Sequence, residues 1–457
     1  MNHPAVRSVC LAVSLASLAS LAHADDWPQW RGPLGDGVWR EDGILKTFPA
    51  KGLPVTWRTP VGLGFSGPAV AGGRVFLMDR TLNEAAAADV KTQWNYRDKT
   101  QGQERVLCLD QATGKILWTH AYPCAYSVAY GSGPRTTPTV QGDRVYTLGA
   151  MGDLFCLEAK TGRVAWQKNF VRDYGAAVPL YGFGSAPLVD GDRLVTAVGG
   201  EGRAVVALDR HTGRELWKSG NATEPGYCAP RVHTFGGRRQ IIVWHADALI
   251  GLEPESGKLL WSIHHPVTAG IAIASPAIEG NRLAVSSQYE GTMMLEFKPG
   301  AEQPVVLWRA SAGTVPERQW KKAGFNTTMS TVLLLGKHVY GVSLYGETCC
   351  LDADTGRRVW TTLRPTSGGD VPRERWSTLF MVPHGDRVFI FNDKGDLILA
   401  RLTPEGYDEI GRSHLLDADM ASAGSGGRKV VWSHPAFADR CVFARNNHEV
   451  VCVSAAD

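Results

Sequence analysis

The sequence predicts an all-β fold, an eight-bladed β-propeller built from four-stranded antiparallel blades. One phrase around Thr-Gly and Trp recurs along the chain, and its copies are evenly spaced. Repeats of about 40–50 residues that supply four strands each are typical of propellers. The 457 residues also include 51 glycines and 15 tryptophans, which favours many tight turns and many large anchoring side chains.

The recurring phrase reads CLDQATGKILW at Cys108–Trp118 and CLDADTGRRVW at Cys350–Trp360, with further copies between and after them. The final residues of successive copies lie 48, 51, 44, 47, 52 and 50 residues apart. The acidic residue and Thr can hydrogen-bond the turn backbone, and Gly supplies positive φ where the hairpin reverses. Trp then begins the outer strand and can wedge between neighbouring blades. The tryptophans expected in this structural role are Trp57, Trp118, Trp166, Trp217, Trp261, Trp308 and Trp360.

A second pattern precedes each phrase and supplies the first two strands of each blade. It is a small-residue-Pro pair, a β-branched step, a Gly-Asp-Arg turn and an apolar strand, as in TPTVQGDRVYTLG from Thr137. The N-terminal segment VTWR at Val55–Arg58 carries a Trp that has no blade before it, and Ser433–Ser454 supplies only three strands. Pairing these segments closes the ring at eight blades near Trp57 and hides both edges. A seven-bladed ring with a loose tail is the alternative.

Three segments lie outside the repeat. Residues 1–24 combine a basic start, an apolar run and an Ala-His-Ala site, which predicts a signal peptide and a periplasmic or secreted protein. Residues 25–53 are expected to form an N-terminal arm, and residues 54–457 the propeller. Residues 82–104 interrupt the first blade between its second and third strands. No later segment is apolar enough to predict a transmembrane span.

Charge and cysteine usage narrow the function classes. The formal charge of +3 carries no clustered basic excess, so we expect no nucleic-acid partner, and we expect a monomer. Cys441 and Cys452 flank a hairpin with Asn446-Asn447 at its tip. A two-residue turn there would place the two cysteines opposite each other, which predicts a cross-strand disulfide. Motifs for metal ligands, phosphate loops and nucleophile elbows are absent from the sequence, so we predict no metal site.

The loops that enter the first strand of each blade meet at the mouth of the ring, and they are rich in aromatic and cationic residues. Such a funnel can hold an anionic or sugar-like ligand. The alternative is that these side chains close the mouth by packing on one another. The candidate ligand-binding or cofactor-binding residues are Tyr130, Arg135, Thr136, Tyr181, Phe183, Tyr227, Arg231, Asn326, Arg375, Trp376, Trp432 and His434.

The repeated phrase resembles the tryptophan-docking motif of the pyrroloquinoline-quinone (PQQ)-type propellers, from Trp57 onward. The opening WPQWRGPLGDGV is similar to the start of an exported bacterial subgroup of that family. The resemblance implies the propeller fold. It also implies two kinds of function, because the family includes PQQ-dependent alcohol and sugar dehydrogenases and a non-enzymatic propeller subunit of the outer-membrane protein assembly machinery.

A quinoprotein needs cations for the three carboxylates of PQQ, oxygen ligands for Ca²⁺ and a base for the substrate proton. Acidic residues are scarce in the loops of the predicted mouth, and the sequence has no C-x-x-C-H haem motif. The leading hypothesis is therefore an exported propeller that acts as a rigid binding or scaffold protein for a protein or polymer partner. The alternative is a quinoprotein oxidoreductase that uses PQQ and calcium on alcohols or sugars. The sequence does not establish that PQQ or calcium binds, and it does not identify catalytic residues.

Overall fold

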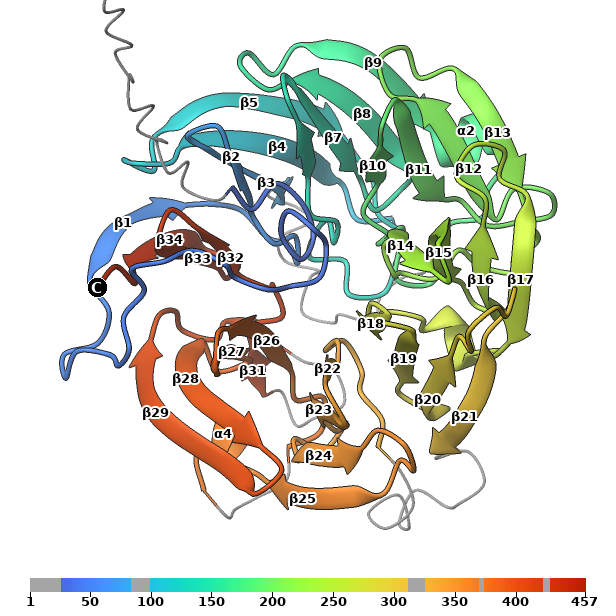
Figure 1. Ribbon diagram of the computed structural model, residues 1–457. Helices are drawn as coiled ribbons and strands as arrows, with labels where there is room; N and C mark the ends of the chain where they lie inside the picture. Colours follow the sequence, from blue (N-terminus) through green and yellow to red (C-terminus); the bar gives the residue numbers. More distant parts are fainter. Residues whose placement is uncertain (1–25, 84–98, 311–324, 370–373, 422–427) are drawn as a thin grey trace, which may run out of the picture.

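The computed structural model describes residues 26–83, 99–310, 325–369, 374–421 and 428–457. Eight four-stranded antiparallel sheets surround a common centre as the blades of a propeller, which confirms the predicted fold class (Figure 1). Helical structure in the described ranges is limited to α2 (Phe170–Tyr174), α4 (Arg364–Ser367) and the 3-10 turn η1 (Thr268–Gly270). No helix of these ranges is long and apolar enough to span a membrane. The predicted signal peptide lies outside the described residues.

The strands of each of the first seven blades follow one another in chain order from the ring centre to the rim. The first four blades contain β2 (Ala69–Ala71), β3 (Arg74–Leu82), β4 (Gly102–Asp110) and β5 (Ile116–Pro123); β6 (Thr139–Gln141), β7 (Arg144–Leu148), β8 (Asp153–Glu158) and β9 (Val164–Asn169); β10 (Leu188–Asp190), β11 (Arg193–Ala197), β12 (Val205–Asp209) and β13 (Glu215–Ser219); β14 (Arg231–Phe235), β15 (Arg238–Trp244), β16 (Ala248–Leu252) and β17 (Leu259–His264).

The last four blades repeat this order, except that the eighth blade takes its outer strand from the start of the chain. They contain β18 (Ala277–Glu279), β19 (Arg282–Ser287), β20 (Gly291–Glu296) and β21 (Val305–Ala310); β22 (Leu333–Leu335), β23 (His338–Val342), β24 (Thr348–Asp352) and β25 (Arg358–Thr362); β26 (Leu379–His384), β27 (Arg387–Asn392), β28 (Asp396–Thr403) and β29 (Gly406–His414); β32 (Ala436–Ala438), β33 (Cys441–Arg445), β34 (Glu449–Ser454) and β1 (Val55–Pro60). A two-stranded sheet, β30 (Met420–Ala421) with β31 (Lys429–Val430), precedes the eighth blade.

The ring closes where the sequence predicts. β1 pairs antiparallel with β34, with Trp57 opposite Cys452. The Trp57 indole also reaches the first blade, where its Nε1 donates to the carbonyl oxygen of Gln111 at 2.9 Å. A Cβ on Gly114 would stand only 2.5 Å from the Trp57 ring, so the glycine is what allows the indole to lie against this turn.

The other structural tryptophans repeat this contact between neighbouring blades, with one exception. Five more indoles donate to a carbonyl oxygen in the turn of the next blade. Trp261 instead donates to Oε1 of Gln240 in its own blade at 2.6 Å, and its ring packs edge-on to Phe297. The turn that Trp261 would meet, between β20 and β21 of the fifth blade, is longer than the corresponding turns of the first four blades.

The hairpin of the eighth blade differs from the predicted register. Arg445 pairs with Val450, and the Asn446 N–H donates to the carbonyl oxygen of Glu449 at 3.0 Å, so the turn lies one residue later than predicted and the predicted pairing of Arg445 with His448 is wrong. The Asn446 side chain stabilises the turn in this position, because its Oδ1 accepts hydrogen bonds from the backbone N–H groups of His448 and Glu449. Cys441 consequently lies opposite Ser454 rather than opposite Cys452.

The described cysteines, Cys441 and Cys452 included, are free thiols in this structure. These two side chains nevertheless interact, because a hydrogen bond with Cys452 lowers the pKa of Cys441. The cross-strand disulfide therefore stays a prediction for the protein in an oxidising compartment. Protein prepared from such a compartment and titrated under denaturing conditions should show two thiols fewer than a reduced sample. Equal counts in the two samples would reject the bond.

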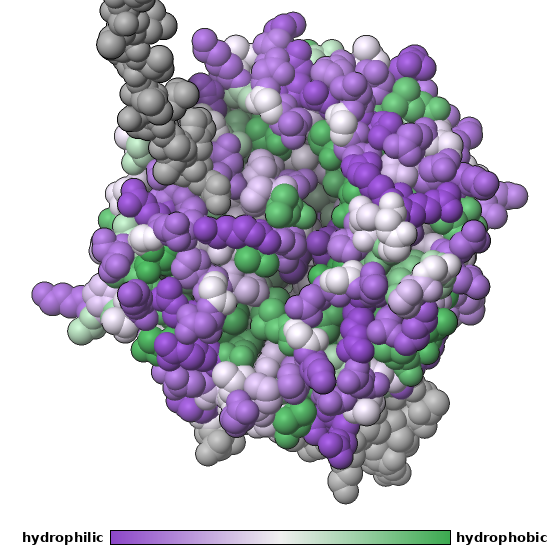
Figure 2. Space-filling view, viewed as in Figure 1, coloured by the Kyte–Doolittle hydropathy of each residue, from purple (hydrophilic) through white to green (hydrophobic). Residues whose placement is uncertain are grey.

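The arm that precedes β1 lies across the face of the propeller turned to the viewer in Figure 1. Trp27 pairs with Val70 of β2, the Trp39 N–H donates to the carbonyl oxygen of Pro383, and the Leu45 N–H donates to that of Ala455. These three contacts connect the arm to the first, seventh and eighth blades. Figure 2 shows the same face, where hydrophobic residues are scattered among hydrophilic ones.

The insertion predicted in the first blade falls in the connection between β3 and β4. These strands pair as far as Leu82 opposite Gly102, which makes them longer than the corresponding strands of the second blade. Residues 84–98 of the insertion lie outside the described residues.

Candidate functional site

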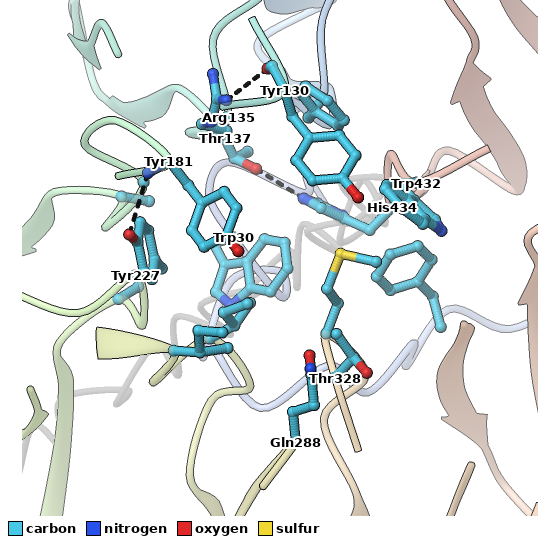
Figure 3. A pocket seen from close by; sticks show the side chains of 18 of the residues that line it. Trp30, Tyr130, Arg135, Thr137, Tyr181, Tyr227, Gln288, Thr328, Trp432 and His434 are labelled. Atoms are coloured by element: carbon cyan, nitrogen blue, oxygen red, sulfur yellow. Dashed lines mark hydrogen bonds between the residues drawn. The ribbon is translucent and has the colours of Figure 1, made fainter. Parts of the chain in front are cut away.

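A cavity of about 300 Å³ lies at the centre of the ring, and aromatic side chains form much of its wall (Figure 3). Trp30 of the arm lines this cavity and also a second cavity beside the arm, and Ala186 and Ala229 likewise line both. Its Nε1 donates to Ser275 Oγ at 2.7 Å, and its ring meets the His434 ring edge-on at 4.1 Å. The lining residues are Trp30, Phe65, Tyr130, Arg135, Thr137, Tyr181, Gly184, Ala186, Tyr227, Ala229, Ile271, Ile273, Gln288, Tyr289, Thr328, Met329, Trp376, Phe380, Trp432 and His434.

Four aromatic rings form a connected arc on one side of the cavity. The ring centroids of Tyr130 and Tyr181 are 6.0 Å apart, those of Tyr130 and Trp432 are 5.6 Å apart, and those of Tyr181 and Tyr227 are 5.8 Å apart. These separations lie in the range in which aromatic pairs attract each other. The contacts between the four rings therefore stabilise the arc, and it presents a stiff surface to an apolar or aromatic group.

Two of the aromatic lining residues have strained backbone. Tyr130 has φ 53° and Trp376 has φ 68°, in the left-handed region that side chains other than Gly rarely adopt. Such positions cost about 1–3 kcal/mol each, and they cluster at ligand clamps and active sites. The strain supports a binding role for this wall rather than a purely structural one.

Arg135 is the only Lys or Arg side chain among the described lining residues, and the backbone around it holds it in place. Its Nη2 donates to the carbonyl oxygens of Ala129 at 2.8 Å and of Tyr130 at 2.6 Å. Its guanidinium also lies 5.1 Å from the centre of the Phe65 ring, and burial lowers its pKa. The described lining contains no Asp or Glu. The part of the wall that the structure describes is thus aromatic and weakly cationic, and it contains no carboxylate.

His434 joins the cavity wall to the propeller core as a neutral ring. Its Nε2 lies 2.7 Å from the Thr137 hydroxyl, and its Nδ1 lies 3.1 Å from the carbonyl oxygen of Pro435. The carbonyl can only accept, so Nδ1 carries the proton and Nε2 accepts from Thr137. Burial lowers the pKa of His434 to about 4, and the charge of Arg31 adds to this effect.

We expect His434 to make the protein sensitive to acid. Because its folded-state pKa is lowered from 6.5 to about 4, its contribution to stability is complete above pH 6.5 and is lost as the pH falls through about 4. The full loss is about 3 kcal/mol. His265 has the same lowered pKa and should contribute in parallel. Urea unfolding of the wild type and of His434→Gln from pH 7.5 to 4 measures this effect. An equally steep loss of stability in both proteins would contradict the assignment.

The structure brings more than half of the predicted mouth residues together around the cavity. Those that line it are Tyr130, Arg135, Tyr181, Tyr227, Trp376, Trp432 and His434. Arg375 lies beside the cavity, with its guanidinium 4.4 Å from the centre of the Trp376 ring. Arg231 lines the second cavity instead.

Three other predicted residues are buried behind the wall. Thr136 donates to the carbonyl oxygen of Leu148, and Asn326 donates through Nδ2 to that of Gln288. Phe183 packs edge-on to Phe170 in the core between two blades. Side chains alternate along an extended segment, so Thr137, the neighbour of Thr136, takes the position in the cavity.

Sequence reasoning missed Trp30, Gln288, Tyr289 and Phe380, which also line the cavity. Trp30 belongs to the arm, which has no repeat to place it. Gln288 and Tyr289 lie between the second and third strands of the fifth blade. The repeat register places this connection on the same face as the loops that enter the first strands, so it is the signal that could have found them.

Comparison with known proteins places the chain among relatives of two kinds. It is 28% identical over 244 residues to the outer membrane protein assembly factor BamB of Burkholderia pseudomallei, which covers 51% of this chain and 57% of the relative. It is 29% identical over 194 residues to the polyvinylalcohol dehydrogenase of a Sphingopyxis strain, which covers 37% of this chain and 28% of the relative. The match thus spans less than two thirds of either relative.

A solved structure of similar shape is a europium-containing methanol dehydrogenase, with a TM-score of 0.58 and 11% identity over 94% of this chain and 89% of that one. This likeness supports the fold alone. The family model described as outer membrane protein assembly factor BamB matches residues 102–362, more than half of the chain. The chain therefore belongs to that family of PQQ-type propeller repeats.

Proposed function

We propose that this chain is a non-catalytic binding protein that holds a protein partner on the propeller axis, with an apolar or aromatic side chain of the partner inserted into the central cavity. The observation that carries the proposal is the aromatic character of the lining, whose described residues include no Asp or Glu. Burial of an aromatic side chain in such a pocket is the usual form of a binding hot spot.

The size and shape of the cavity support this occupant. A volume of about 300 Å³ accommodates one large side chain and its neighbours. Figure 3 shows the Tyr130 hydroxyl and the Gln288 amide directed into the cavity, where they can bond the backbone of an inserted segment. We also propose that the protein is periplasmic or secreted and that it acts as a monomer.

The described residues also argue against proton transfer at this site. A general base needs a titratable group that is free to accept a proton near neutral pH. Both nitrogens of His434 already have partners, and Arg135 donates to backbone carbonyls. Burial raises the pKa of Tyr227 far above neutrality. The described lining thus offers a surface for binding rather than a base.

The alternative of a quinoprotein oxidoreductase finds less support in the lining. PQQ carries three carboxylates, whereas the described lining offers one guanidinium that already bonds backbone carbonyls. Ca²⁺ prefers carboxylate and carbonyl oxygens, but no Asp or Glu is among the described lining residues. No cluster of three His, Cys, Asp or Glu suited to a metal ion occurs in the described ranges. The described lining residues therefore do not fit PQQ and calcium.

A random heptapeptide library displayed on phage tests the proposed function. We expect the selected peptides to share an aromatic or large aliphatic residue and to quench the tryptophan emission of the protein. Tyr181→Ala should weaken their binding at least tenfold, because it removes the centre of the aromatic arc. Leu259→Ala is the matched control, since Leu259 is 49% exposed on an outer strand and should bind like the wild type.

The competing outcomes are distinct. Selected peptides that bind Tyr181→Ala and the wild type equally would contradict insertion into the cavity. If the library yields no binders while polyvinyl alcohol or maltoheptaose binds saturably, that result would contradict a protein partner and indicate a polymer partner instead.

A further inference from the structure

A second cavity, of about 180 Å³, lies between the arm and the inner strands of the third and fourth blades. Pro33 and Leu34 of the arm form one side, and Leu188 and Val189 of β10 lie on the propeller side. Leu34 is 67% exposed, although it stands at the edge of this cavity. The site is thus a partly apolar groove that the arm borders but does not fill.

The arm supplies backbone hydrogen bonds to the inner edges of the first two blades, and in the described part of the chain it makes none to the inner edge of the third. Trp27 exchanges two hydrogen bonds with Val70 of β2, and the carbonyl oxygen of Pro28 accepts from the N–H of Val140 of β6. Val189 holds the same position in β10, two residues before the turn.

The pairing of β10 with β11 explains why the backbone N–H and C=O of Val189 can bond a ligand in the groove. In β10, Asp190 pairs with Arg193 across the turn, and Val189 lies opposite Leu194. Narrow and wide pairs alternate in an antiparallel ladder, so the N–H and C=O of the residue next to the turn pair point away from the partner strand. The Val189 backbone groups therefore face the groove, as those of Val70 and Val140 face the arm.

Cationic groups gather at the same groove. Arg231 lines it and is 8% exposed, and its Nη1 donates to the carbonyl oxygen of Pro276 at 2.6 Å. Arg31 lies near Arg231 beside the loop Gly35–Gly37, and its Nη2 donates to the carbonyl oxygen of Asp36. Both of these acceptors are neutral backbone carbonyls.

The nearby carboxylates are already engaged. The Asp36 carboxylate accepts from Arg40 and from the N–H of Val38. The Asp190 carboxylate accepts from Arg193 and Arg239. Within the described ranges, neither Arg31 nor Arg231 lies within ion-pair distance of a carboxylate, so the groove carries an excess of positive charge.

We infer that this groove binds the C-terminal end of an extended peptide, whose backbone pairs with Val189 and whose free carboxylate meets the guanidinium of Arg231. The last side chain of the peptide would lie against Leu34 and Leu188. Strand addition at an open edge and capture of a terminal carboxylate are both established modes of peptide recognition. This site adjoins the central cavity, with which it shares Trp30, Ala186 and Ala229, but it would take a different ligand and goes beyond the proposed function.

The test compares acetyl-Thr-Val-Thr-Val-Val bearing a free carboxylate with the same peptide as its C-terminal amide, by isothermal titration calorimetry on the full chain. We expect the acid to bind at least tenfold more tightly than the amide. Arg231→Met should reduce the affinity of the acid to that of the amide. Arg238→Met is the matched control, because Arg238 lies on the exposed part of the same blade and should change nothing.

A second variant keeps the inference testable if Arg231→Met fails to fold. Val189→Pro removes the N–H that faces the groove, and it leaves the hydrogen bonds between β10 and β11 intact. It should weaken both peptides by a similar factor. Equal binding of acid and amide to the wild type, or no saturable binding, would overturn the inference. If inorganic phosphate binds as tightly as the acid peptide, the groove is a general anion site, and the inference that it recognises a peptide is overturned. Tyr181→Ala should leave this binding unchanged, which separates the result from that of the central cavity.

Discussion

Trp57→Ala should destabilise the propeller by about 3–5 kcal/mol, the range observed when large buried aromatic residues are truncated to Ala. The Trp57 side chain is buried, and it connects the last blade of the ring to the first. Its loss removes the indole hydrogen bond to Gln111 and leaves a void over Gly114. Equilibrium unfolding in guanidinium chloride, followed by far-UV circular dichroism, measures the change.

The control for this variant lies on the same strand. Val55 of β1 is 48% exposed, so Val55→Ala should change the free energy of unfolding by less than about 0.5 kcal/mol. If Trp57→Ala were as stable as Val55→Ala, the closure of the ring through this indole would be wrong. The comparison separates the indole contact from a general effect on β1.

Glu104→Ala should cost about 3–5 kcal/mol, because it removes a buried carboxylate on which several donors depend. The Glu104 carboxylate is fully buried and accepts from the hydroxyls of Tyr122 and Tyr126. It also accepts from the N–H of Ala150 in the second blade at 2.9 Å. Each donor left unpaired in the core adds its own desolvation penalty. Urea unfolding monitored by tyrosine and tryptophan fluorescence measures the loss.

Glu104→Gln is the informative control because it keeps the shape and removes the charge. Burial raises the pKa of Glu104, so this group's contribution to stability is present below its unfolded pKa and is lost as the pH rises through its folded value. We therefore expect Glu104→Gln to gain stability relative to the wild type as the pH rises from about 4 toward neutrality. A difference between the two proteins that does not change with pH would show that Glu104 ionises normally.

The fold could be predicted because the residues of each repeat indicate which residues of the next blade they contact. Five tryptophans, Trp57 among them, lie against a Gly in the next blade, and the unpaired Trp57 required a partner at the end of the chain. These are nearest-neighbour rules, and their repetition along the chain reinforces them. The prediction failed where local chemistry differed from the repeat. Asn446 stabilises a shifted turn through its own side chain, and Trp261, which faces the longer turn of the fifth blade, bonds Gln240 of its own blade.

The cavity was harder to predict because its wall depends on side-chain direction and on a segment outside the repeat. The loops that enter the inner strands gave the correct region, and they supplied Tyr130, Tyr181 and Trp432. A step of one residue along the chain decides between cavity and core, as Thr136 and Thr137 show. The arm adds Trp30, whose position follows from backbone pairing with other blades and cannot be read from the repeat.

The central claim, that the cavity binds a partner and does not serve quinone chemistry, is tested most directly by equilibrium dialysis of the purified chain against PQQ with Ca²⁺. The same samples would be assayed for dye-linked oxidation of alcohols and sugars. We predict no saturable uptake of PQQ and no turnover, with binding of library-selected peptides unchanged by PQQ. Stoichiometric PQQ uptake accompanied by oxidation of an alcohol or a sugar would contradict the account.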